Sequence, residues 1–305
     1  MRGALVRELL PRAGDENFLF ITGDLGFDVL EPLREKMGSR FINGGIAEQN
    51  IVSVAAGAAR AGMKVWVYSI GPFLFSRAAE QIRNDIGLNN TPVTLVANGA
   101  GLHYGVQGPS HFSADDLGFL TSVQNLETLT PAFEEDMRDV VSHSFESQTP
   151  TYIRLGRNSV SRPPDLNAGF SKVRKVLEGK KGVLLCFGSI VGDYLQEASE
   201  IRVSERPAVW VATTVPKSPA DLDKALVAEL SASLNNVIVE EHVKKGGFGM
   251  NFINVLHEAG LLKDLEIRCL ALEDSVFSQY GSQAFLKKLS GLDAGTVLRQ
   301  FGIGG

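Results

Sequence analysis

Short apolar runs alternate with amphipathic segments along the whole chain. The runs are rich in Val, Ile and aromatic residues and have the length of strands, whereas the segments between them have helical periodicity. In the first half this pattern predicts strands at 17–23, 64–70, 92–98, 125–131 and 150–155. In the second half it predicts strands at 182–188, 208–214, 236–242 and 266–272. The alternation is typical of an α/β protein with parallel sheets covered by helices on both faces.

One stretch loses this periodicity and marks a division of the chain. Residues 156–170 gather Pro, Asn, Ser and Gly, a composition typical of a linker between domains. We therefore expect a first domain at 1–160, a linker at 161–170 and a second domain at 171–305. The second domain should contain a smaller sheet of its own.

Two capping signals predict where helices begin. Ser113 and Asp116 have the spacing of a capping box after the loop at 99–112. Thr130 and Pro131 have the residue types of an N-cap and a first helical position. A helix over 132–145 should follow the second signal.

Composition and charge exclude several kinds of protein. The chain has 305 residues, of which 44% are hydrophobic and 21% charged, and its net charge is −5. The sequence contains no basic run with interleaved aromatic residues, so we do not expect a nucleic acid partner. Charges interrupt the apolar residues of 1–20, so this stretch predicts neither a signal peptide nor a membrane span. We expect a cytoplasmic protein.

The two cysteines lie within apolar, strand-like runs. Cys186 occurs in VLLCFG and Cys269 in EIRCLALE. Isolated cysteines in such surroundings predict buried thiols rather than a disulfide framework or a metal site.

The stretch NGGIAEQNIVSVAAGAA at 43–59 places one acid, Glu48, between a glycine turn and a helix of small residues. An acid in the first turn of a helix is favoured by the helix dipole, so capping alone could explain it. The small residues, however, allow another backbone or a second subunit to approach closely. Such packing would desolvate the carboxylate and make it a directed hydrogen-bond partner for a ligand. Both interpretations remain open at this point.

Three further loops could carry chemistry, because ligands of α/β proteins bind at the carboxyl ends of strands. The glycine-rich loop 98–112 contains His103 and His111. Phe73 and Phe75 follow a predicted strand and could stack on a flat ring, although aromatic residues at such junctions commonly belong to the core.

Arg157, in RLGRN at 154–158, also follows a predicted strand. Its guanidinium could bind a phosphate or a carboxylate. Arginine in a linker is otherwise commonly a solvated residue.

Taken in chain order, four motifs resemble the transketolase family of thiamine-diphosphate enzymes. They are GDL at 23–25, RFINGGIAEQN at 40–50, GPSH at 108–111 and RLGRN at 154–158. These enzymes have a diphosphate-binding domain, a pyrimidine-binding domain and a C-terminal domain, and this chain resembles the second and third. The resemblance implies a structural role for residues 171–305, including a part in dimer assembly.

The resemblance implies a cofactor, thiamine diphosphate, and residues that contact it. In the family the glutamate of GIAEQN hydrogen-bonds to N1′ of the aminopyrimidine ring, which assigns that role to Glu48. Asp24 of GDL matches an acid near the cofactor. Phe73 and Phe75 are the candidates to stack on the ring, although Ala78 and Ala79 occupy the place where a tyrosine is common.

The resemblance also implies residues that contact a sugar. GPSH resembles the family motif GPTH and makes His111 a catalytic and substrate-binding candidate. Arg157 would hold a sugar phosphate, and Arg2 is a further candidate because an arginine precedes the equivalent helix in the family. His103 and Gln107 in the same loop as His111 complete the substrate-binding set.

A partner chain is expected as well. The family binds the diphosphate and Mg²⁺ through a GDG-type motif followed by a suitably spaced Asn, and this sequence contains no such element. We therefore expect the C-terminal subunit of a split transketolase, in which the partner supplies the diphosphate site and most of the Mg²⁺ ligands. The expected assembly is a dimer of heterodimers, and the expected reaction transfers a two-carbon ketol unit from a ketose to an aldose.

Several departures from the family pattern keep alternatives open. Gln107 stands where transketolases usually have an acid that contacts the donor, so the donor sugar is undetermined, and a non-catalytic regulatory partner of a transketolase is a second hypothesis. Deoxyxylulose-phosphate synthases share a GIAEQ-like motif, yet Ala100 occupies the place of their substrate-binding arginine. The beta subunits of 2-oxoacid dehydrogenases have a similar size but a different loop in place of GPSH.

Overall fold

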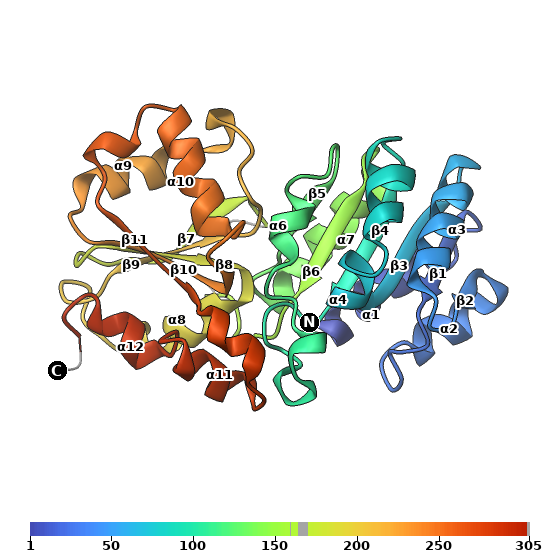
Figure 1. The fold of residues 1–305 in the computed structure, drawn as a ribbon, viewed down its shortest axis with the longest axis horizontal. Coiled ribbons are helices and arrows are strands. Elements are labelled where there is room, and N and C mark those ends of the chain that lie inside the picture. The colour runs from blue at the N-terminus through green and yellow to red at the C-terminus, as the bar shows by residue number, and fades with distance from the viewer. Residues whose placement is uncertain (159, 164–169, 304–305) are drawn as a thin grey trace.

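The chain folds around two sheets that lie next to each other (Figure 1). The structure is a computed structural model, and it describes residues 1–158, 160–163 and 170–303. One sheet contains six strands and the other contains five.

The first sheet is parallel throughout, with the strand order β2-β1-β3-β4-β6-β5. Its strands are β1 Phe18–Thr22, β2 Phe41–Asn43, β3 Lys64–Ile70, β4 Val93–Asn98, β5 Glu127–Leu129 and β6 Thr151–Leu155. Because side chains alternate along a strand, Phe18 and Phe20 of β1 point into one core and Leu19 and Ile21 into the other.

Helices cover both faces of this sheet. One face carries α1 Arg2–Leu9, α2 Glu31–Met37 and α7 Met137–Glu146. The other carries α3 Glu48–Arg60, α4 Gly71–Phe75, α5 Ala79–Gln81 and a π-helical turn at Ile82–Gly87. The short helix α6 Asp116–Leu120 joins the two halves, because Leu120 packs under the first sheet and Leu117 in the core of the second.

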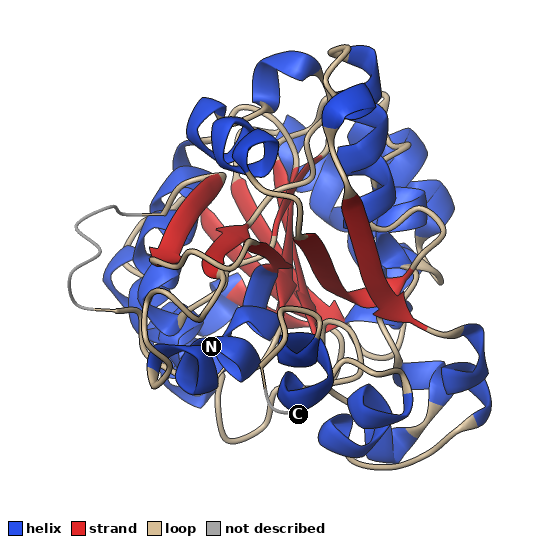
Figure 2. Cartoon of the chain, turned by 90° about the vertical axis from the view of Figure 1, so that its left-hand side faces the viewer, coloured by secondary structure: helices blue, strands red, loops and turns tan. Residues whose placement is uncertain are grey.

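The second sheet has the order β11-β10-β8-β9-β7. Its strands are β7 Val173–Leu177, β8 Val183–Phe187, β9 Ala208–Ala212, β10 Asn236–Val243 and β11 Ile267–Leu272. One face carries α9 Lys224–Ala232 and α10 Phe248–Glu258, and the other carries α8 Val191–Ser199, α11 Gln283–Leu289 and α12 Ala294–Arg299. Figure 2 shows the helices enclosing the strands of the molecule.

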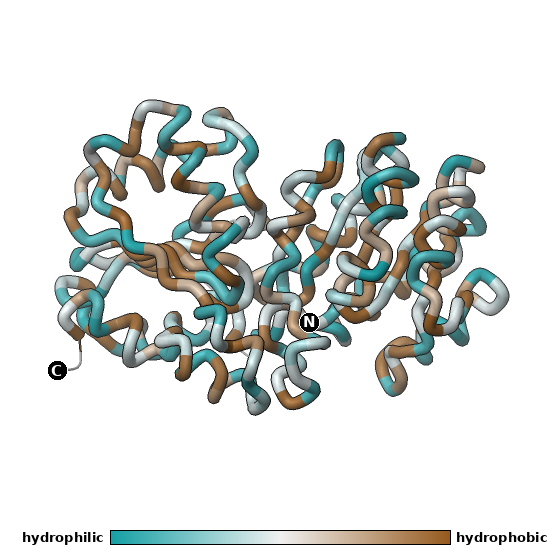
Figure 3. The backbone as a smooth tube through the Cα atoms, in the orientation of Figure 1, coloured by the Kyte–Doolittle hydropathy of each residue, from teal (hydrophilic) through white to brown (hydrophobic). Residues whose placement is uncertain are grey.

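The predicted α/β class is confirmed, and each of the nine predicted strands overlaps an observed one. Figure 3 shows the physical basis, since the hydrophobic segments of the second sheet run together through its centre. Two strands were not predicted. Strand β2 has only three residues, and β7 alternates buried and partly exposed positions at the edge of its sheet. The expectation of wholly parallel sheets is wrong at β7, which runs antiparallel to β9.

Both capping predictions are wrong: at the first a buried ion pair takes the acid, and at the second the helix begins further along the chain. The hydroxyl of Ser113 has no hydrogen-bond partner, and the carboxylate of Asp116 binds Arg154. The second helix begins at Met137 after a 3-10 turn at Glu134–Asp136. Asp136 Oδ2, rather than Thr130, accepts the N–H groups of residues 132 and 133, at 3.0 and 3.1 Å.

Other predictions concern the cysteines, the linker and the membrane. Both cysteines are free; Cys186 is buried, whereas Cys269 is partly exposed in β11. Residues 164–169 of the predicted linker lie outside the described residues, so the domain boundaries stay a prediction. Among the described ranges we found no helix with the length and apolar character that crossing a bilayer requires.

A fully buried polar cluster lies where the two halves meet. Arg154 at the end of β6 donates from Nε to Asp116 Oδ2 at 2.8 Å, and the two side chains are 3% and 0% exposed. His242 of β10, 0% exposed, accepts the N–H of Leu117 at Nε2 over 3.2 Å. Its Nδ1 lies 2.6 Å from the Val243 carbonyl oxygen and is the ring's donor. This pattern requires a neutral imidazole.

We expect stability to fall as His242 is forced to take up a proton. Burial lowers the pKa of His242 from 6.5 to about 4, despite the opposing charge of Asp116, 3.7 Å away. The pKa of His242 is lower in the folded than in the unfolded state. Neutral His242 therefore contributes fully to the free energy of unfolding above pH 6.5, and this contribution is lost as the pH falls towards 4. The loss should reach about 3 kcal/mol in the free energy of unfolding.

Urea unfolding of the wild type and of His242→Gln at several pH values measures this effect. Subtracting the two curves removes the contributions of groups that the variant retains, including His103 and Glu240. A difference that is flat between pH 6.5 and 4 would contradict the assigned neutral state.

Candidate functional site

The candidate residues gather at one edge of the first sheet. They follow the carboxyl ends of β1, β2, β3, β4 and β6, and are, in that order, Asp24, Glu48, Phe73, the loop 99–112 and Arg157. This edge is where open α/β sheets bind ligands. The fold therefore brings residues that are far apart in the sequence to the same edge of the sheet.

Glu48 begins α3 and is 1% exposed. Its Oε1 accepts a hydrogen bond from the Ser69 hydroxyl at 3.0 Å, and its Oε2 accepts one from Arg77 Nη1 at 2.5 Å. Ala47 is the N-cap residue of α3, and no side chain caps it. The carboxylate therefore faces the ends of the strands, and helix capping does not explain its position.

The glycine turn before Glu48 is required by close contacts. A Cβ on Gly44 would lie 2.5 Å from Cγ1 of Ile51, and Gly45 has a φ of +73°. After β1, a Cβ on Gly23 would lie 3.3 Å from both Glu48 Oε1 and Ser69 Oγ. Gly23 thus leaves the space beside the buried carboxylate, and Gly44 leaves the space for Ile51 one turn further along α3.

Asp24 is exposed and lies beside this turn. It has a φ of +48°, and its Oδ1 accepts a hydrogen bond from Asn43 Nδ2 at 2.8 Å. Asn43 Oδ1 accepts in return from the N–H groups of Asp24 and Gly45, at 3.1 and 3.0 Å. Asn43 thus holds the two loops together, which favours Asp24 as a member of the site.

The two candidate aromatic rings have different surroundings. Phe73 is half-buried; the Arg77 guanidinium lies 4.5 Å from its ring centroid and the His111 ring, edge-on, 5.1 Å away. Phe75 is 7% exposed and packs in the core beneath α3. The structure therefore leaves Phe73 as the candidate ring partner, and Phe75 does not face the site.

Arg77 was not predicted, and it supplies the counter-charge of Glu48. We expect Arg77→Gln to lower the free energy of unfolding by about 1 kcal/mol, because Arg77 is 40% exposed and solvent screens part of the attraction. The loss should disappear when Glu48→Gln is already present. A double-mutant cycle by urea unfolding measures this coupling. Equal losses in both backgrounds would mean that the pair adds nothing to stability.

The loop 99–112 places three rings in a row beside Phe73. The Tyr104 ring lies 6.3 Å from His111 and 5.0 Å from His103, and its hydroxyl accepts from Asn98 Nδ2 at 2.5 Å. Gly108, with a φ of +84°, turns the backbone just before His111. Gln107 is exposed at the tip of the loop, in the 3-10 turn Gly105–Gln107.

Positive charge gathers around His103. Burial, together with the charges of Arg2 and Arg157, lowers the pKa of His103 from 6.5 to about 4. Burial also raises the pKa of Tyr68, the neighbouring Tyr104 raises it further, and Arg2 opposes both. His103 is therefore neutral near pH 7, and its neighbourhood favours an anion or a hydroxyl-rich ligand.

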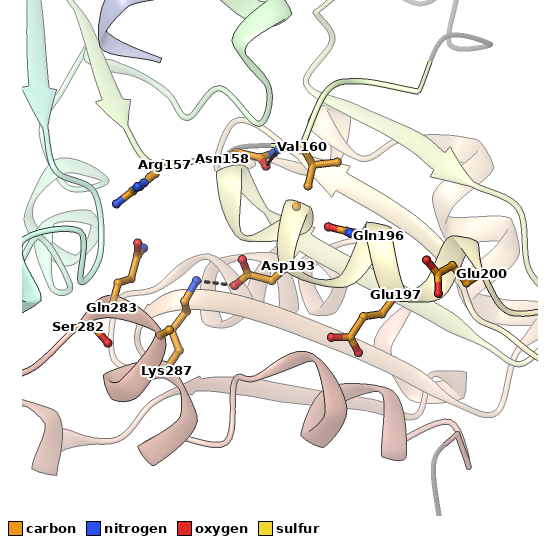
Figure 4. A pocket seen from close by; sticks show the side chains of 12 residues that line it. Arg157, Asn158, Val160, Asp193, Gln196, Glu197, Glu200, Ser282, Gln283 and Lys287 are labelled. Atoms are coloured by element: carbon orange, nitrogen blue, oxygen red, sulfur yellow. Dashed lines mark hydrogen bonds and ion pairs between the residues drawn. The ribbon is translucent and has the colours of Figure 1, made fainter.

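A cavity of about 660 Å³ opens beside Arg157, between the end of β6 and helices α8 and α11. Figure 4 shows Arg157 and Asn158 on one wall and Gln283 and Lys287 on the other. Lys287 forms an ion pair with Asp193 across this space. The cavity gives Arg157 room for a ligand between the two halves of the chain.

Sequence reasoning missed Ser69, Arg77, Tyr104 and Asn43. Arg77, in the turn after α4, could have been found, because it follows Phe73 by four residues, a spacing at which helical side chains share a face. The described part of the chain holds no group of three His, Cys, Asp or Glu side chains arranged as metal ligands.

Comparisons with known proteins agree with this geometry. Residues 6–163 match the model of the transketolase pyrimidine binding domain. The chain is 31% identical over 269 residues to 1-deoxy-D-xylulose-5-phosphate synthase of Clostridium perfringens, covering 87% of this chain and 42% of the synthase. It thus spans about two fifths of the length of that relative.

Two further relatives match along most of their length. An apulose-4-phosphate transketolase subunit of Actinobacillus succinogenes is 29% identical over 272 residues, which cover 88% of this chain and 86% of the relative. A solved structure described as a split gene transketolase, inactive beta4 tetramer, has a TM-score of 0.81 at 25% identity and covers 99% of this chain. The chain belongs to the transketolase family of thiamine-diphosphate enzymes, and residues 6–163 form its pyrimidine-binding domain.

Proposed function

We propose that this chain is the pyrimidine-binding subunit of a heteromeric transketolase, which transfers a two-carbon ketol unit from a ketose to an aldose. The buried carboxylate of Glu48, aimed at the strand ends beside Phe73, is the observation that carries the proposal. A charged group is retained at such depth only where it has partners or a function. Arg77 is a charged partner of Glu48, and its side chain is 40% exposed.

The residues present fit the aminopyrimidine end of thiamine diphosphate. Gly23 leaves space beside the carboxylate, and the half-buried Phe73 ring lies under the guanidinium of Arg77, a side chain that is 40% exposed. Glu48 would hold a proton shared with N1′, and Phe73 would orient the flat ring. When bound, thiamine diphosphate supplies the nucleophilic carbon that attacks the ketose carbonyl.

The other candidates would act on the sugar. His111, edge-on to Phe73, would contact the hydroxyl or carbonyl oxygen nearest to the cofactor. The neutral His103 would donate to or accept from a further hydroxyl. Arg157, with Arg2 nearby, would hold the phosphate of a sugar phosphate at the mouth of the cavity.

A partner chain would supply the diphosphate site and most of the Mg²⁺ ligands. The match to a transketolase subunit of similar length, along 86% of that relative, supports a split enzyme. Exposed apolar side chains surround the glycine turn and the outer face of α3: Phe27, Ile42, Ile46 and Val54, exposed by 67%, 39%, 76% and 47%. Apolar residues grouped around a functional site favour a protein interface. We propose a dimer of heterodimers.

Two other functions have support from specific observations. The 31% identity to a deoxyxylulose-phosphate synthase favours decarboxylation of pyruvate, whereas Ala100 lacks the side chain that such a synthase would use on its substrate. Gln107 in place of an acid favours a non-catalytic partner. Consumption of pyruvate would indicate the synthase-like function. A complex that does not activate the cofactor would indicate the non-catalytic partner.

Reconstitution tests the proposal. The chain is mixed with its candidate diphosphate-binding chain, thiamine diphosphate, Mg²⁺, a ketose phosphate and an aldose phosphate, and ketol transfer is followed. Turnover should require both chains. Consumption of pyruvate without ketol transfer, or equal turnover with and without this chain, would contradict the proposal.

Arg157→Ala should raise the apparent KM for a phosphorylated ketose by about tenfold to a hundredfold, since a hydrogen bond to a charged group contributes about 1.5–3 kcal/mol. The kcat should change little, and an unphosphorylated ketose should show no change in KM. Arg202→Ala, which alters an arginine 80% exposed in the second domain, is the matched control. An equal rise in KM for both kinds of ketose would contradict phosphate binding by Arg157.

A further inference from the structure

The loop that carries His103 and His111 is anchored in the second domain. Leu102 and Phe112, at its two ends, are 0% and 2% exposed and belong to the core formed by β8, β9 and β10 with α8, α11 and α12. By sequence the loop connects two elements of the first domain. Its position is therefore determined by residues of the second domain, which are distant from it in the sequence.

Glu241 of β10 makes a buried polar contact with this loop. Its side chain is 7% exposed, and Oε1 accepts the N–H of Leu102 at 2.6 Å. Gln283 Nε2 donates to both carboxylate oxygens, at 2.8 and 3.0 Å, and holds the carboxylate in place. On Gly101, where φ is +61°, a Cβ would lie 2.6 Å from Glu241 Cδ. The backbone just before His103 thus lies directly on this carboxylate.

Three further contacts tie the loop and the residue that follows it to the second domain. The N–H of Gly281 donates to the Gly105 carbonyl at 3.2 Å. The Tyr280 ring lies so close to Gly108 that a Cβ there would be 2.0 Å from its Cε1. Arg154 Nη2 bridges the loop and β10, because it donates to the carbonyl oxygens of Ser113 and Glu241, at 2.6 and 3.3 Å.

We propose that Glu241 is a positioning residue of the site, which holds the start of loop 99–112 so that His111 lies against Phe73 and His103 against Tyr104. This inference rests on the proposed function of these histidines. Without the carboxylate, the buried N–H of Leu102 has no acceptor, which costs free energy unless the loop moves to find one. The second domain would then act on catalysis within its own chain, in addition to any role in assembly.

Three variants of the full chain, each reconstituted with the diphosphate-binding chain, test this. Glu241→Ala removes the acceptor, and Glu241→Gln keeps an oxygen where Oε1 lies. Glu240→Ala is the matched control: its carboxylate is 1% exposed and accepts instead from the N–H groups of Phe248 and Gly249, at the start of α10. Loss of either acid should lower stability, but only Glu241 contacts the loop.

We expect Glu241→Ala to lower the kcat by about tenfold to a hundredfold, the effect of a small misplacement of site groups. The KM for thiamine diphosphate should not change, and Glu241→Gln should restore most of the kcat. A kcat that falls equally in Glu241→Ala and Glu240→Ala, or that Glu241→Gln fails to restore, would overturn the proposal.

Titration of His103 by NMR in the full chain gives a readout that needs no activity. The wild-type pKa of His103 is lowered to about 4 by burial and by Arg2 and Arg157; it should rise towards 6.5 in Glu241→Ala and stay low in Glu240→Ala. An unchanged titration in Glu241→Ala would overturn the positioning role. Absence of ketol transfer by the wild-type complex would refute the proposed function alone, because this titration would still report the loop.

Discussion

Glu48→Gln should lower the turnover of the complex by about a hundredfold to ten-thousandfold, the range attributed to general acid and base catalysis. The amide has nearly the same shape as the carboxylate, so Ser69 keeps an acceptor and the glycine turn stays in place. It cannot share a proton with a ring nitrogen as a carboxyl group does. Steady-state rates of ketol transfer measure the effect, while the KM for the sugar should change little.

Glu240→Gln is the control for this variant. Glu48 and Glu240 are both 1% exposed, but Glu240 lies in β10 and accepts from the start of α10, away from the cofactor site. If both variants lost the same activity, burial of an acid rather than its place in the site would explain the result.

Asp116→Ala should lower the free energy of unfolding by about 3–5 kcal/mol, the cost of breaking a buried ion pair from one side. Arg154 is only 3% exposed and would keep its charge with two carbonyl oxygens as its remaining partners. His242 would also lose its nearest acid. Such a loss is a large part of the stability of an ordinary domain, and urea unfolding measures it.

Glu205→Ala provides the comparison, because its partner Arg202 is 80% exposed and solvent screens the pair. Its effect should be close to zero. If Asp116→Ala were also close to neutral, the junction between the two halves would not depend on this ion pair.

The strands of the core could be predicted because apolar runs report burial directly. All nine predicted strands have an observed counterpart, including β5, which is only three residues long. Strand β2 could not be predicted, because its three residues are partly or fully exposed and form no apolar run. Strand β7 pairs antiparallel at an edge, an outcome that depends on β9 rather than on its own residues.

Polar side chains were harder to predict, because their partners are distant in the sequence. Ser113 and Asp116 have the spacing of a capping box, but Arg154, 38 residues further along, binds Asp116. In the same way Glu48 could be placed at the site from its motif, whereas its partner Arg77 lies 29 residues further along, in the turn after α4. Local sequence patterns indicate which interactions a residue can form, whereas the fold determines which partner lies close to it.

Phe75 illustrates the same limit on the site itself. Two phenylalanines separated by one residue looked equivalent in the sequence. In the structure α4 turns Phe75 into the core and leaves Phe73 at the strand ends. Which of the two faces the site depends on the bounds of a five-residue helix.

The most direct test of the central claim is exchange of the C2 proton of thiamine diphosphate with solvent deuterium, followed by NMR. The exchange depends on proton transfer at the cofactor and does not require the donor sugar to be known. The complex of this chain with its diphosphate-binding partner should exchange the proton much faster than the cofactor in buffer, and Glu48→Gln should remove most of the acceleration. Exchange at the buffer rate in a complex that binds the cofactor would contradict the claim that this chain supplies the activating carboxylate.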